Sequence, residues 1–74
     1  MAMDYTVVIE PAEDGSYSVF VPDLPGCISC GNTMDEALDM VKEAIRGHVQ
    51  SLREHGEPVP EPRSTARVVH AAMT

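Results

Sequence analysis

The spacing in this chain that most resembles a chemical motif is Cys27-Ile28-Ser29-Cys30. Cysteine pairs with this spacing are redox-active when they begin a helix, because the positive end of the helix dipole lowers the pKa of a thiol. Here the helical pattern begins only after Thr33, three residues beyond Cys30. In an extended segment the side chains of Cys27 and Cys30 point to opposite faces. The pattern therefore favours structural cysteines over a redox or metal site.

Histidines do not complete a metal site on the same cysteines. Together with His48 and His55 they form the pattern C-x2-C-x17-H-x6-H, whose second histidine spacing is wider than the three to five residues typical of zinc sites. His48 and His55 lie seven residues apart, on one face of a predicted helix, where they extend an apolar stripe. We therefore expect no metal and no cofactor.

The acidic residues likewise do not converge on an active site. Asp4, Glu10, Asp23 and Asp39 are the carboxylates nearest the ends of predicted elements. A metal-dependent nuclease needs several carboxylates around two ions, and the first two predicted strands carry none in mid-strand. The sequence also contains no Ser-His-Asp arrangement, phosphate-binding loop or dinucleotide glycine pattern. We expect that the chain is not an enzyme.

Length and charge narrow the class of protein further. The 74 residues form one predicted domain, 1–74, and a core of this size is marginal alone, so we expect a homodimer or higher homo-oligomer. The net charge of −7 disfavours direct binding to nucleic acid and suits a basic protein partner. With no long apolar run and no signal-peptide pattern, we expect a cytoplasmic protein without membrane contact.

The elements predicted from periodicity and turn signals follow the order β-β-β-α-β. Alternating β-branched residues predict strands at about 5–10 and 16–21, joined as a hairpin, and a short strand at about 27–31. Thr33 and Gly56 bracket an amphipathic helix at about 34–55, with acidic residues Asp35 and Glu36 in its first turn. The predicted fold class is α+β: two layers, with one long helix packed on one face of an antiparallel sheet.

The chain after the helix is predicted to be a stiff spacer followed by a last strand. Residues 57–62 alternate with proline and favour an extended polyproline conformation. Residues 64–71 carry β-formers with Arg67 and His70 among them, which predicts a partly exposed strand. This strand could pair within its own sheet or with that of a neighbouring subunit.

The loop that joins the hairpin to the third strand has the most constrained sequence. Its prolines fix φ and its glycine permits a positive φ, so it should be an ordered turn. The simpler interpretation is a rigid connector between two strands, and the alternative is a contact surface that presents Asp23 and Leu24. The residues of the loop that carry these two interpretations are Pro22, Asp23, Leu24, Pro25 and Gly26.

These motifs together resemble the HicB-like antitoxin family in its short, single-domain form. The resemblance spans Tyr5 to about Pro62. It rests on Tyr5 with its Val-Val-Ile strand, Asp14-Gly15, Tyr17, Val21-Pro22-Asp23-Leu24-Pro25-Gly26-Cys27, Gly31, Thr33-Met34-Asp35-Glu36-Ala37-Leu38 and Gly56.

The resemblance implies a degraded ribonuclease H-like fold without catalytic carboxylates, and a role as an antitoxin. The implied partner is a small basic HicA-like toxin that cleaves mRNA. Many family members also carry a DNA-binding domain, which the sequence after Pro62 does not match. The loop residues 22–26 with Asp35 and Glu36 are the candidate partner contacts. The alternative is a stand-alone oligomeric binding or scaffold domain without a toxin partner.

Overall fold

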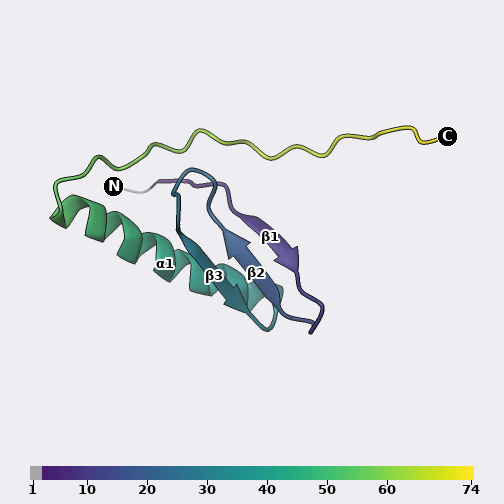
Figure 1. The fold of residues 1–74 in the computed structure, drawn as a ribbon, viewed down its shortest axis with the longest axis horizontal. Coiled ribbons are helices and arrows are strands. Elements are labelled where there is room, and N and C mark those ends of the chain that lie inside the picture. Colours follow the sequence, from purple (N-terminus) through teal and green to yellow (C-terminus); the bar gives the residue numbers. More distant parts are fainter. Residues whose placement is uncertain (1–2) are drawn as a thin grey trace.

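The computed structural model describes residues 3–74 as a three-stranded antiparallel sheet with one helix packed across it (Figure 1). The strands are β1 (Val8–Pro11), β2 (Tyr17–Phe20) and β3 (Ile28–Gly31), in that spatial order, and the helix is α1 (Met34–Glu54). The predicted α+β class and two-layer arrangement are confirmed. No helix within residues 3–74 has the length and apolar character needed to cross a membrane.

The core lies between α1 and the helix-facing side of β2 and β3. Its apolar centre consists of Val19, Val21, Leu24, Cys27, Ala37 and Val41. Strand alternation sends the neighbours of Val19 to the opposite face of the sheet. On that outer face the register aligns Val8 with Phe20 and Phe20 with Ile28, which gives one apolar row across all three strands. Ile28 is 70% exposed, so α1 leaves this row uncovered.

β1 begins three residues later than predicted, because its partner strand ends early. Phe20 is the last paired residue of β2 and lies opposite Val8. Beyond it, the amide of Val21 donates to the carbonyl of Cys27 within the loop. The segment 5–7 therefore has no strand to pair with in β2, although its β-branched residues favour an extended conformation.

Both predicted helix caps are present. Thr33 is the N-cap, and its hydroxyl oxygen accepts a hydrogen bond from the Glu36 amide at 3.0 Å. At the other end Gly56 has a φ of 67°, and the amide of Glu57 donates to the carbonyl of Leu52 at 2.8 Å. This six-to-one bond is that of a Schellman motif, which needs a left-handed residue such as glycine.

Gly31 permits the sheet to meet the helix closely. A Cβ at this position would lie 2.8 Å from the Cα of Ala37 and 2.9 Å from the carbonyl carbon of Glu36. Both are backbone atoms of the first helical turn, so they cannot move aside independently. The end of β3 and the start of α1 can therefore pack at this distance only with a glycine at position 31.

The strand predicted over residues 64–71 is wrong for this structure. Residues 57–74 contain no helix or strand, and they run as an extended arm past the N-terminal segment (Figure 1). The residues favour a strand, but a strand forms only where its backbone finds a partner, and here the arm leaves the sheet. The Cα radius of gyration is 14.4 Å, against about 11 Å expected for a compact domain of this length.

Candidate functional site

The loop between β2 and β3 consists of two consecutive turns. The amide of Leu24 donates to the Val21 carbonyl at 3.0 Å, and the amide of Cys27 donates to the Leu24 carbonyl at 3.0 Å. In the second turn Pro25 and Gly26 occupy the central positions, and Gly26 has a φ of 85°. That combination is typical of a type II turn. The prediction of an ordered connector matches these bonds.

Leu24 anchors this loop in the core. Its side chain is 0% exposed and packs in the cluster that includes Val19 and Val41. The prediction that Leu24 could contact a partner is wrong, because the side chain has no free surface. Pro22, Pro25 and Gly26 are exposed and remain available at the surface of the loop.

Asp23, the other predicted contact residue, binds a distant part of its own chain. One carboxylate oxygen accepts hydrogen bonds from the amides of Arg63 and Ser64, both at 2.8 Å. The other oxygen accepts one from the Ser64 hydroxyl, also at 2.8 Å. The Ser64 and Arg63 amides and the Ser64 hydroxyl hold the pKa of Asp23 below its usual range, because all three stabilise the charged form.

Two further side chains hold the same stretch of the arm. The hydroxyl of Thr6 donates to the Ser64 carbonyl at 2.8 Å, and the hydroxyl of Tyr5 donates to the Pro60 carbonyl. Removal of the Tyr5 ring from water raises the pKa of its phenol, and the negative charge of Asp23 adds to this effect. We call the arm segment 60–64, with its contacts to Tyr5, Thr6 and Asp23, the arm tether.

The acidic start of α1 is exposed, as expected. Asp35 and Glu36 lie in the first turn, where negative charge is favourable beside the free amides of a helix. Glu43 is exposed about two turns further along and pairs with Arg46 at 2.8 Å. This part of the helix therefore presents carboxylates to solvent.

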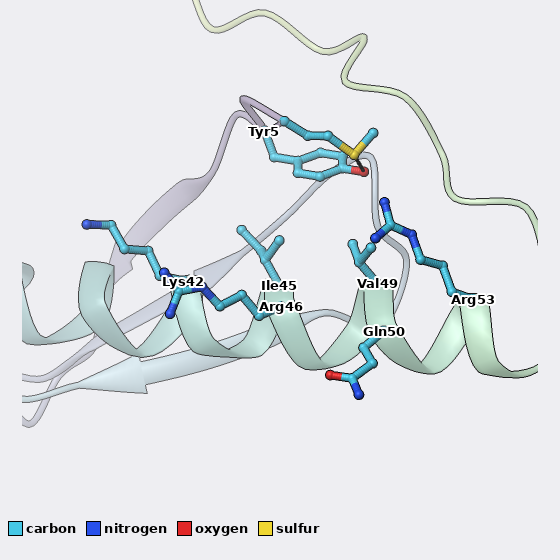
Figure 2. A pocket seen from close by; sticks show the side chains of 8 residues that line it. Tyr5, Lys42, Ile45, Arg46, Val49, Gln50 and Arg53 are labelled. Carbon is cyan, nitrogen blue, oxygen red and sulfur yellow. Dashed lines mark hydrogen bonds between the residues drawn. The ribbon is translucent and has the colours of Figure 1, made fainter. Parts of the chain in front are cut away.

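Two hollows lie between the N-terminal segment and α1. The first, of about 730 Å³, is lined by Met3, Tyr5, Lys42, Ile45, Arg46, Val49, Gln50 and Arg53 (Figure 2). The second, of about 640 Å³, is lined by Met3, Asp4, Tyr5, Val7, Asp35, Leu38, Asp39, Val41, Lys42 and Ile45. Both have apolar side chains from the helix stripe and charged side chains around them. Neither was predicted from the sequence.

The cysteines and histidines do not form a chemical site within the described residues. Cys27 is buried, Cys30 is exposed, and both are free thiols. Burial raises the pKa of the Cys27 thiol, which makes it less reactive. His55 lies at the C-cap of α1, where its ring nitrogen Nδ1 lies 2.7 Å from the Ser51 carbonyl. Residues 3–74 contain no group of three or more potential metal ligands.

The chain matches a family model described as the HicB-like antitoxin of bacterial toxin–antitoxin systems, over residues 5–73. It is 49% identical over 69 residues to a UPF0150 protein of Thermoplasma acidophilum, covering 93% of this chain and all of that one. The family match includes the arm tether and most of the arm beyond it.

Two solved structures have a similar fold. The antitoxin HicB of Burkholderia pseudomallei superposes with a TM-score of 0.75 and 41% identity, over 86% of this chain and 48% of that one. A chain of a HicA3 and HicB3 toxin–antitoxin complex superposes with a TM-score of 0.70 and 30% identity, over 82% of this chain and 70% of that one. The chain thus spans the whole Thermoplasma relative but about half of the Burkholderia antitoxin. With the family match over residues 5–73, this likeness shows that the chain belongs to the HicB-like antitoxin family.

Proposed function

We propose that this chain is the antitoxin of a toxin–antitoxin pair and neutralises a small basic HicA-type toxin by binding it. The observation that supports this most is the similarity, over 82% of the chain, to a chain of a HicA3 and HicB3 toxin–antitoxin complex. We further propose that the chain acts by binding alone, without catalysis, and in the cytoplasm.

The surface charge of the protein is consistent with such a partner. All twelve acidic residues lie between Asp4 and Glu61, against five basic residues in the whole chain. Carboxylates at Glu36 and Glu43 are exposed on α1, and neither lines the two hollows. Long-range attraction between this surface and a basic toxin would speed their encounter, and close pairs would fix the orientation.

A direct test is co-purification with a HicA-type protein encoded beside this chain. We expect a stable complex, and growth arrest caused by the toxin should be relieved when both proteins are produced together. If the neighbouring protein is not toxic, or does not co-purify with this chain, the proposal fails.

Charge variants locate the contact. Glu36→Gln with Glu43→Gln removes two carboxylates from the exposed face of α1, and we expect slower association and weaker binding. The matched control is Glu57→Gln with Glu61→Gln, which removes the same charge beyond the end of the helix. Equal loss of binding in the two variants would show that only the net charge matters, and no loss in either would exclude this face of α1.

The second candidate is a stand-alone oligomeric binding domain without a toxin. The open hollows beside α1 and the extended arm favour it, because a second copy of the same chain could cover the hollows and pair with the arm. The adjacent reading frame separates the two candidates: a short basic frame supports the antitoxin, and its absence supports the stand-alone domain.

A further inference from the structure

The helix is much longer than the sheet that covers it. Each strand has four residues and spans about 13 Å, whereas the 21 residues of α1 span about 31 Å. Only Ala37 and Val41 of the helix are buried. Leu38 and Ile45 belong to the same apolar stripe but are only half-buried, and they line the second hollow. The core is therefore incomplete on the side of β1.

The hollow on that side adjoins an open sheet edge. β1 is an outer strand of the sheet, and among residues 3–74 it pairs only with β2. Val7, directly before β1, lines the second hollow together with Leu38 and Ile45. A fourth strand added to this edge would extend the sheet and would cover the half-buried part of the helix. An unpaired edge of this kind is a template for strand addition.

The arm beyond its tether has the properties of such a strand. No backbone amide of residues 65–74 donates a hydrogen bond within the described residues. Val68 is 102% exposed and Val69 is 81% exposed, although β-branched residues pack best in a sheet. These ten residues reach about 33 Å beyond Ser64 when fully extended.

Charge indicates where the arm binds. Asp4, Asp35 and Asp39 line the second hollow. The arm beyond Glu61 carries no acidic residue and contains Arg67 and His70. The hollow, lined by these three carboxylates and by one cation, Lys42, has an excess of negative charge. It therefore suits a strand with two valines flanked by basic side chains.

The arm does not fill the hollow of its own chain. The tether holds Ser64 against Thr6 and Asp23, and from there the arm runs out past the sheet into solvent (Figure 1). A second copy supplies an identical arm and an identical open edge. In a two-fold dimer one kind of contact then satisfies both chains, since each arm can lie on the edge of its partner.

We propose that residues 65–71 pair with the β1 edge of a second copy and cover the hollow lined by Val7, Leu38 and Ile45. The exchange is reciprocal, so the dimer contains two four-stranded sheets. The outer apolar row of Val8, Phe20 and Ile28 is not part of this contact and stays free. The inference does not depend on a toxin, because it concerns the protein alone.

Light scattering on the full chain, without any partner, tests the proposal. We expect a dimer at micromolar concentration, and Val68→Asp with Val69→Asp should weaken the dimer at least about tenfold. The matched control is Ala72→Asp with Met73→Asp, which adds the same charge just outside the proposed strand and should leave the dimer intact. Because dimerisation depends on concentration, a protein that stays monomeric up to about 100 µM would overturn the proposal. A dimer that tolerates Val68→Asp with Val69→Asp would overturn it as well.

Isotope-filtered NMR on a mixture of labelled and unlabelled chains identifies the surface that the arm binds, and whether it belongs to the same copy or to another. Adjacent residues of a strand face opposite sides of a sheet, so one of the two valines should face the hollow. We expect intermolecular contacts from the methyl groups of that valine, Val68 or Val69, of one copy to Val7, Leu38 and Ile45 of the other. If these contacts occur only within one copy, the arm folds back on its own sheet and the exchange is excluded. If the contacts between copies fall on Phe20 and Ile28 instead, the dimer uses the outer face and the proposal is wrong.

Discussion

The carboxylate of Asp23 accepts hydrogen bonds from both the amide and the hydroxyl of Ser64, which lies 41 residues later in the chain. Asp23 lies in the loop between β2 and β3, and Ser64 lies in the arm that follows α1. This contact, with those of Thr6 and Tyr5, fixes the point from which the arm departs. The loop that connects β2 to β3 therefore also presents a carboxylate that binds the arm.

Removal of this carboxylate should release the arm without unfolding the domain. In Asp23→Ala the amides of Arg63 and Ser64 lose their acceptor, and we expect their hydrogen exchange to accelerate several-fold. Amides of the core strands should keep their protection, because Asp23 lies at the surface of the loop.

Asp14→Ala is the matched control for that variant. Asp14 accepts hydrogen bonds from the amide and hydroxyl of Ser16, so it has a similar set of bonds in another turn. Its loss should accelerate exchange at Ser16 and leave Arg63 and Ser64 unchanged. Unchanged exchange at Ser64 in Asp23→Ala would contradict the tether.

The tether should also depend on pH. Because the pKa of Asp23 is lowered in the folded protein, the charged form binds the arm and the contact is complete above the ordinary aspartate pKa of about 3.9. As the pH falls through the lower, folded value, protonation removes the negative acceptor and weakens the tether. NMR should show the Asp23 carboxyl carbon and the Ser64 amide titrating together, below about pH 3.9. A Ser64 amide that is insensitive to this titration would argue against the contact.

Gly31→Ala should destabilise the protein. The added methyl group would lie within 3 Å of the backbone of Glu36 and Ala37, and neither can move without shifting the start of α1. Overpacking of this kind costs about 1–3 kcal/mol, which urea unfolding measures as a lower midpoint. An unchanged midpoint would show that β3 and α1 are not as close as the structure places them.

Gly47→Ala should have the opposite effect. Gly47 lies inside α1 and is exposed, and apart from its chain neighbours and the nearby backbone of its own helix no atom lies within 4 Å of an added Cβ. Alanine is favoured over glycine in a helix by about 1 kcal/mol, so the free energy of unfolding should rise by up to that amount. A fall in stability would indicate that this face of the helix packs against another chain, and therefore that it forms part of an oligomer interface.

The sequence predicted the regular elements well, because their signals are local. The N-cap Thr33, the C′ glycine Gly56 and the turn glycine Gly26 each act within a few residues, and each lies where the pattern placed it. The relation to the ribonuclease H-like fold stays a prediction. So do the homo-oligomer and the absence of nucleic-acid binding.

The errors concern contacts between distant residues. Leu24 was predicted to be exposed because it lies between two prolines in a loop. Whether a loop side chain is buried depends on the core residues it can pack against, which the local sequence does not specify. The pairing of Asp23 with Ser64 has no local signal. The strand expected at 64–71 has the right composition but pairs with no strand among the residues that the structure describes, and composition alone does not supply a partner. The hollows beside α1 depend on the short length of the strands, which periodicity overestimated.

The most direct test of the antitoxin role is an RNA-cleavage assay with a purified HicA-type toxin encoded beside this chain. Addition of the purified chain should reduce cleavage to the background rate as the two proteins reach equal concentrations, and the complex should elute as one species. Undiminished cleavage with the chain in excess, and separate elution of the two proteins, would contradict the account.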